Sequence, residues 1–142
     1  MINKEDLRIG NIVNYGINQK EGGITLNRGV ITALTENKAI VNNIAIKYCN
    51  LYPITFNETM LNLIGFYHDA TLIGVIKNTF RYKNSSIALN VINSIANQIT
   101  AYENIYKEYV ESIIQINCNY LHELQNCYYF IAKTELEINN IL

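Results

Sequence analysis

Residues 29–48, GVITALTENKAIVNNIAIKY, decide the fold class. Three short runs of β-branched and small apolar residues (29–34, 39–41 and 44–48) are separated by polar residues that favour turns. Residues 35–38 predict one turn, and Asn42-Asn43 predicts a tight hairpin turn. Several short strands at this spacing predict a small curled antiparallel sheet of SH3-like type.

The flanking residues extend this β-rich part over residues 1–56. Residues 7–15 alternate loosely and are expected to break at Gly16, and Gly22-Gly23 predicts a turn or loop. The only proline, Pro53, closes the region. Residues 57–64 then predict a short central helix, with Asn57 as its N-cap and Gly65 at its end.

The second part, residues 57–142, is expected to be α+β and to complete a single domain over 1–142. Residues 72–76 and 86–92 predict strands, and residues 120–132 predict a helix that packs on the sheet through an apolar stripe. The stripe consists of Leu121, Leu124, Tyr128 and Ile131. Residues 135–138 suggest a closing edge strand.

The segment from Ile95 to about residue 116 fits two structures. Apolar and tyrosine side chains recur every three or four residues, which fits one face of a helix. The same segment is rich in Tyr, Ile, Val and Thr and also fits strand alternation. Periodicity leaves both alternatives open.

Composition excludes several classes of function. Apolar residues make up 49% of the chain and charged residues 16%, a balance that favours a folded core over disorder. The net charge is −1, from 11 basic and 12 acidic side chains, and the basic residues are scattered. A nucleic-acid polymer is therefore not an expected partner. No apolar run approaches the roughly 20 residues of a membrane span, and the polar, acidic start does not look like a signal peptide.

Catalytic and metal motifs find little support. His122-Glu123 begins like a zinc-protease helix, but Asn126 occupies the place of the second histidine. The three cysteines, Cys49, Cys118 and Cys127, are an odd number without framework spacing, so we expect reduced, partly buried thiols. No metal, cofactor or catalytic residue is expected.

Two groups of residues are candidate binding sites. His122, Gln125, Asn126 and Tyr129 share one face of the last helix, apart from its apolar stripe. These side chains either bind a polar ligand, or form hydrogen bonds with neighbouring backbone and hold the helix in place. The second interpretation is favoured. Arg81, Tyr82 and Lys83 form the second group, in which a base would stack on Tyr82 and a basic side chain would bind a small anionic ligand.

Three segments together carry a resemblance to a known family. Residues 7–13, LRIGNIV, are similar to an "LRIGN-x-V" opening. Residues 53–61, PITFNETML, followed by Gly65-Phe66, are similar to a "PI-x-L-T-E-E-x-L-L … GF" segment. Residues 122–130, HELQNCYYF, are similar to "HQLQNLYF". Glu135-Leu136 matches its closing "EL". The chain thus resembles a family of small uncharacterised proteins of gut Bacteroidales and their phages. It departs at Glu123, Cys127 and Lys133, where that pattern has Gln, Leu and Gly.

The resemblance implies a small α+β protein encoded by phages or integrated elements, and it favours strand over helix between about Gln98 and Ile116. From it we expect a non-catalytic phage or prophage accessory protein that binds a partner in the cytoplasm, that of the host cell if it is phage-encoded. The protein would act in counter-defence by sequestering a host protein or a small nucleotide signal. Its many tyrosines suggest a homo-oligomer. A structural or assembly component of a phage particle is the alternative, and an enzyme that depends on His122 is a third hypothesis.

Overall fold

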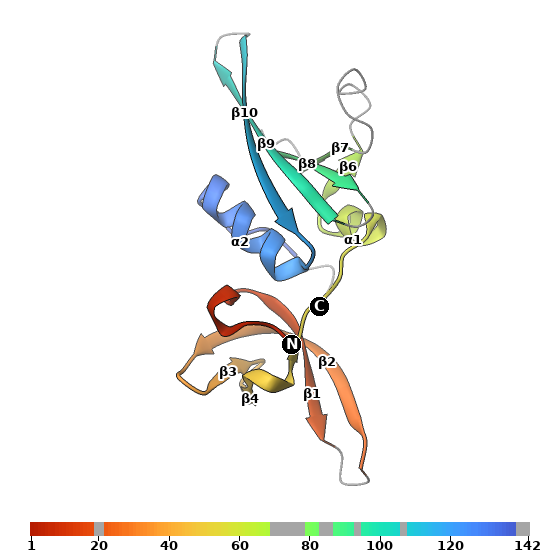
Figure 1. The fold of residues 1–142 in the computed structure, drawn as a ribbon, viewed down its shortest axis with the longest axis vertical. Coiled ribbons are helices and arrows are strands. Elements are labelled where there is room, and N and C mark those ends of the chain that lie inside the picture. Colours follow the sequence, from red (N-terminus) through yellow and green to blue (C-terminus); the bar gives the residue numbers. More distant parts are fainter. Residues whose placement is uncertain (19–21, 69–78, 83–86, 93–94, 106–107, 139–142) are drawn as a thin grey trace.

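The computed structural model describes residues 1–18, 22–68, 79–82, 87–92, 95–105 and 108–138. The fold is α+β, as the sequence predicts: the described residues form two five-stranded antiparallel sheets together with short helices. Figure 1 shows the first sheet in the lower half of the molecule and the second in the upper half. The last helix, α2 (Leu121–Ala132), lies against the upper sheet and reaches down to the first residues of the chain.

The first sheet has the strand order β4-β3-β2-β1-β5. Its strands are β1 (Ile12–Asn18), β2 (Ile24–Leu34), β3 (Lys38–Val41), β4 (Ile44–Lys47) and β5 (Leu51–Tyr52). One 3-10 helix, η1 (Lys4–Asp6), precedes β1, and another, η2 (Tyr48–Asn50), joins β4 to β5. The hairpin turn at Asn42-Asn43 is confirmed, since both residues join β3 to β4 at positive φ, 49° and 65°.

The expected break at Gly16 is wrong, because β1 runs through this glycine. Gly16 pairs with Leu26, and neighbouring side chains cross the space where its own side chain would lie. A Cβ atom there would be only 2.9 Å from Ile24 Cγ2 and 3.4 Å from the Tyr52 ring. Gly16 is thus a point of close packing within a strand, not a strand end.

A short helix, α1 (Glu58–Leu63), follows the first sheet. The Asn57 side chain accepts a hydrogen bond from the Met60 backbone N–H at 2.9 Å, so it caps the helix start. Gly65, at φ 97°, turns the chain out of the helix and into β6. Among the described residues, no helix is long and apolar enough to cross a lipid bilayer.

The second sheet is a meander in the order β10-β9-β8-β7-β6. Its strands are β6 (Phe66–His68), β7 (Thr79–Tyr82), β8 (Ile87–Ile92), β9 (Ile95–Ile105) and β10 (Glu108–Cys118). The strand predicted at residues 86–92 is confirmed as β8, apart from its first residue, which lies outside the described part. The strand predicted at 72–76 lies wholly outside it.

The ambiguous segment is a long hairpin of two strands, β9 and β10. Its register runs from Glu108 opposite Ile105 to Gln115 opposite Gln98, and it shifts between Gln115 and Cys118. The first part of β9, from Ile95 to Ala101, also pairs with β8, so this part of the strand is hydrogen-bonded on both edges. The tyrosine and isoleucine spacing that also fits a helix is thus overridden by strand pairing.

The edge strand suggested at residues 135–138 does not form. These residues follow α2 in irregular backbone, yet Leu136 and Ile138 are buried. The Glu137 backbone N–H donates to the Tyr82 hydroxyl at 3.3 Å instead of joining a sheet ladder. Alternating burial came from packing over the second sheet, and the sequence pattern alone could not distinguish this from a strand.

Two apolar clusters form the core, and β1 contributes to both. Val13 belongs to the cluster beneath the first sheet, with Ile31, Val41 and Leu51. The preceding residue, Ile12, points the other way and joins the cluster around α1, α2 and the second sheet. This second cluster includes Phe56, Leu61, Phe66, Tyr82, Leu121, Leu124 and Tyr128.

Candidate functional site

The candidate site lies where the start of α2 meets the amino-terminal segment. The Glu123 carboxylate reaches back to accept hydrogen bonds from the backbone N–H groups of Asn119, at 2.7 Å, and Tyr120, at 3.2 Å. It thereby satisfies donors that a helix start leaves unpaired. The Leu121 N–H donates to the Ile54 carbonyl at 2.8 Å, which fixes the helix start to the chain before α1.

Gln125 connects α2 to the beginning of β1. Its Oε1 accepts from the Ile12 backbone N–H at 2.8 Å, and its Nε2 donates to the Gly10 carbonyl at 2.9 Å. The side-chain amide therefore pairs with the strand as another peptide group would. The residue is only 1% exposed, and its bond with the Ile12 N–H is buried, whereas the bond with the Gly10 carbonyl is partly buried.

Asn126 makes a second set of bonds one position along the helix. Its Oδ1 accepts from Asn11 Nδ2 at 2.8 Å and from Arg8 Nε at 3.2 Å, while its Nδ2 donates to the Asp6 carbonyl at 2.7 Å. Asn11 is fully buried, and its own Oδ1 accepts from the Arg8 N–H at 2.7 Å. Each amide in this group has its partners within the protein.

Arg8 extends these contacts to the end of the described chain. Its guanidinium forms a two-pronged ion pair with the Glu135 carboxylate, with Arg8 Nη2 2.9 Å from Glu135 Oε2. Hydrogen bonding from Arg8 lowers the pKa of the Glu135 carboxyl. The same guanidinium lies over the Tyr129 ring, 4.2 Å from its centroid.

Two of the four polar residues predicted on this helix face make backbone hydrogen bonds of the kind that the favoured interpretation expects. Gln125 and Asn126 bond to the amino-terminal segment and hold the helix in place. Tyr129 is 41% exposed and contacts Arg8. His122 differs, because it is buried and faces a cavity.

The other predicted group does not form a surface site around Tyr82. The Tyr82 ring is buried between Phe66 and Tyr128, with both centroids 5.0 Å away, so it offers no free face to a stacked base. The apolar ring packs in the core, and its hydroxyl accepts from Glu137 N–H. Arg81 precedes it in β7, but the position of its side chain is not described, and Lys83 lies outside the described residues.

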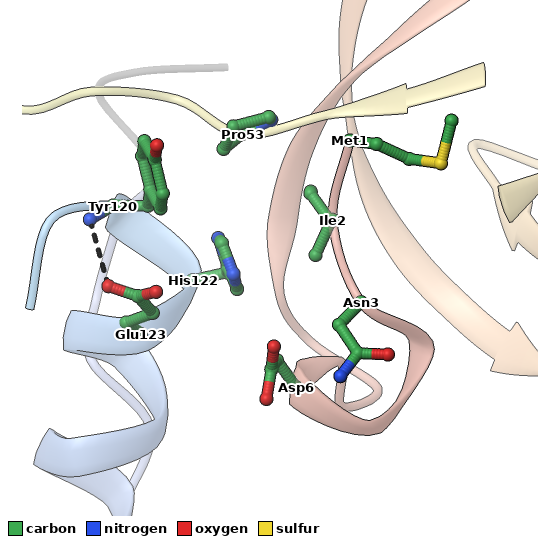
Figure 2. Close-up of a pocket in the computed structure, with 8 residues that line it drawn as sticks. All are labelled: Met1, Ile2, Asn3, Asp6, Pro53, Tyr120, His122 and Glu123. Carbon is green, nitrogen blue, oxygen red and sulfur yellow. Dashed lines mark hydrogen bonds between the residues drawn. The ribbon is translucent and has the colours of Figure 1, made fainter. Parts of the chain in front are cut away.

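A cavity of about 60 Å³ lies between α2 and the first residues of the chain. Figure 2 shows His122 pointing across it towards Ile2 and Asn3, with Asp6 at one side and Pro53 and Tyr120 at the other. The Tyr120 and His122 rings stack at 5.9 Å with an angle of 9° between their planes. Glu123 also borders the cavity, so two carboxylate residues lie at its rim.

His122 is the unusual group in this cavity. Its side chain is 2% exposed, and its Nδ1 has no hydrogen-bond partner among the described residues. Burial lowers the pKa of His122, although the Glu123 and Asp6 carboxylates partly oppose this. The ring is therefore neutral near pH 7, with one nitrogen as donor and the other as acceptor.

The cavity could hold only a small polar group. Its volume of about 60 Å³ exceeds the roughly 10–15 Å³ that one water needs, so the cavity could take a few waters or the end of one side chain. Over the described ranges, no group of three or more His, Cys, Asp or Glu side chains is placed to hold a metal ion.

Sequence reasoning found the helix side of this site but missed its partners. Asp6, Arg8 and Asn11 carry ordinary polar side chains, and nothing in their spacing shows that they meet residues more than a hundred positions away. Residues 7–13 and 122–130, the first and third segments quoted for the resemblance, bond to each other through Arg8, Asn11 and Asn126. In comparisons with known proteins, no family model, curated protein or solved structure matches this chain.

Proposed function

We propose that this chain is a non-catalytic accessory binding protein of the phage or prophage type, and that it holds a small hydrogen-bonding group of its partner in the His122 cavity. The unpartnered Nδ1 of His122 carries the proposal. A buried polar atom without a partner costs free energy, so native proteins rarely leave one unsatisfied. In the tautomer whose Nδ1 is the acceptor, an incoming N–H or O–H group would satisfy it once the ring turns this buried atom towards the cavity.

The charge around the cavity favours a cationic donor over an anion. Asp6 and Glu123 border the cavity, and no lysine or arginine side chain does so among the described residues. A primary ammonium group, such as the end of a lysine side chain, fits both this charge and the small volume. A whole nucleotide does not fit, since pockets for such ligands occupy about 300 Å³ or more.

These properties support a host protein over a nucleotide signal as the sequestered partner. The counter-defence role rests on the resemblance to the Bacteroidales and phage family, as does action in the host cytoplasm. We therefore propose that a protein partner inserts one basic side chain beside His122.

The test follows the His122 ring signals by NMR while lysine-containing peptides are added to the full chain. We expect these signals to shift with a lysine peptide and not with its acetylated form or with nucleotides. Asp6→Asn removes charge at the cavity and should weaken binding several-fold. Glu5→Gln, in the same 3-10 turn but outside the cavity, should bind as the wild type does. Unmoved His122 signals with every peptide, or equal weakening by both variants, would overturn the proposal.

The alternative, a structural or assembly component of a phage particle, is supported by exposed apolar side chains on the β1–β2 hairpin. Ile24 and Leu26 are 62% and 58% exposed and lie on one face of β2. Such residues are common where copies of a chain associate, which also supports the expected homo-oligomer. This alternative predicts the protein at fixed stoichiometry in purified virions, and its absence there would rule the alternative out.

We also propose that the first sheet is a barrel of SH3-like type. Its meander returns through η2 so that β5 pairs with β1, and this pairing supports closure. An experimentally determined structure with β4 splayed away from β5 would contradict it.

A further inference from the structure

Two of the three cysteines lie side by side between the second sheet and α2. Cys118 ends β10, Cys127 lies in the middle of α2, and their Sγ atoms are 3.6 Å apart. Cys118 is 1% exposed, whereas Cys127 is half-buried. The third thiol, Cys49, is exposed in η2.

The two thiols are chemically unequal. The Cys118 S–H donates a hydrogen bond to the Cys127 sulfur. That bond lowers the pKa of Cys127, although burial and the Glu123 carboxylate oppose this. The bond and burial together raise the pKa of Cys118. Cys127 is therefore both the more accessible sulfur and the one that more readily forms a thiolate, the reactive species.

We propose that Cys118 and Cys127 are a redox modification site that closes to a disulfide when the protein meets a peroxide. First, the Cys127 thiolate attacks one peroxide oxygen, so that an S–O bond forms, the O–O bond breaks and hydroxide leaves. Cys127 is then a sulfenic acid. Next, the Cys118 sulfur attacks the Cys127 sulfur, an S–S bond forms and the S–O bond breaks. The departing hydroxide takes the Cys118 proton and leaves as water.

The overall change is balanced: two thiols and one hydrogen peroxide give one disulfide and two waters. The thiols lose two electrons and the peroxide gains them. Formation of the disulfide requires the two sulfurs to close from 3.6 Å to about 2.05 Å. A thiol donor such as dithiothreitol reverses the bond by exchange.

This proposal does not depend on the binding function, because neither sulfur borders the His122 cavity. The bond would join the end of β10 to the middle of α2. It would thereby tie the helix that carries Gln125 and Asn126 more firmly to the second sheet.

The experiment treats the reduced full chain with an equimolar amount of hydrogen peroxide, alkylates remaining thiols and maps peptides without reduction. We expect a Cys118–Cys127 linked peptide, a loss of about 2 Da from the intact protein and recovery of both thiols with dithiothreitol. Cys49 should stay a free thiol during the peroxide step and should therefore be found alkylated. Cys49→Ser, the matched control, should leave the rate of disulfide formation unchanged.

Two variants separate the steps. In Cys118→Ser, whose hydroxyl can still donate a hydrogen bond to the Cys127 sulfur, Cys127 should accumulate as a sulfenic acid that dimedone traps. In Cys127→Ala, oxidation of Cys118 should slow at least about tenfold, because the remaining thiol is buried and weakly ionised. If peroxide oxidises Cys49 while both other thiols stay reduced, or yields mainly disulfides between chains, the proposal is wrong. The wild-type map decides this even where a variant fails to fold.

Discussion

The Gln125 side-chain amide pairs with the backbone at the start of β1, and its bond with the Ile12 N–H is buried, whereas its bond with the Gly10 carbonyl is only partly so. Gln125→Leu would leave the buried Ile12 N–H without a partner and remove the bond to the half-buried Gly10 carbonyl. We expect the free energy of unfolding to fall by about 3 kcal/mol, measured by urea denaturation. Tyr129→Phe, on the same helix face but exposed, should change it by less than about 0.5 kcal/mol. Equal effects of the two changes would contradict the structural role of Gln125.

His122 makes stability depend on pH. Because burial holds the pKa of His122 below its ordinary 6.5, the unfolded chain binds the proton at higher pH than the folded protein does. The free energy of unfolding is thus highest above about pH 6.5, and it declines as the pH falls towards the folded-state pKa of His122. Glu135 acts in the same direction, but only below its ordinary value of 4.5. Urea titrations between about pH 5 and 7.5 isolate the histidine.

The chain has two histidines, so the control for that titration is direct. His122→Leu should remove the slope of stability against pH in this window, and His68→Gln should keep it. A slope lost only with His68→Gln would show that the assignment is wrong.

Lys133 ends α2 in the left-handed region, at φ 57°, where glycine is favoured. Lys133→Gly should relieve about 1 kcal/mol of backbone strain. It also removes the contact of Lys133 Nζ with the Phe130 ring, 4.6 Å away, which contributes about 0.5 kcal/mol. Thermal denaturation should therefore show a net gain. Lys133→Ala keeps the strain and loses the contact, so it should be less stable than the wild type; a more stable Ala variant would contradict this account.

At the residue scale, sequence reasoning could identify donors and acceptors but not their partners. It placed Gln125 and Asn126 on one helix face because that depends only on local periodicity. It offered Tyr82 as an exposed ring on which a base would stack, because the chain has more tyrosines than one core needs to bury. The structure buries that ring, since cross-strand and helix contacts decide burial.

Among the elements, Gly29 in β2 lies tightly against the end of β3. A Cβ atom on Gly29 would lie 2.7 Å from Val41 Cγ1 and 2.7 Å from Asn42 Nδ2. Gly29→Ala should therefore lower the free energy of unfolding by about 1–3 kcal/mol in urea denaturation. Gly23→Ala is the matched control, because nothing lies within 4 Å of its added Cβ. A loss of stability as large at Gly23 would contradict the contact as the cause.

Elements whose signals are local were predictable from the sequence. The turn at Asn42-Asn43 needs only residues that tolerate positive φ. Periodicity did not decide between helix and strand for the β9–β10 hairpin, because its tyrosines and isoleucines satisfy both periods. The choice depends on pairing with β8. The irregular segment after α2 mimicked a strand because Leu136 and Ile138 alternate inward.

Across the whole molecule, β1 links the two halves, because its residues Ile12 and Val13 enter different apolar clusters. We therefore expect residues 1–56 and 57–142 to unfold in one cooperative transition, as a single domain does. Calorimetric and van't Hoff enthalpies of unfolding should agree. Two separate transitions, with amides of β1–β5 exchanging well before those of β9 and β10, would contradict this.

The bonds from Arg8 and Asn11 to Asn126 join residues 118 and 115 positions apart. During synthesis at about 5–20 residues per second, the first residues would wait on the order of ten seconds for the helix that completes them. Contacts of such high sequence separation also slow folding, because loop closure must precede any gain from them. For most of translation the nascent chain thus exposes the segment around Arg8 and Asn11 without its partners in α2. Chaperone binding during that interval should concentrate on this segment.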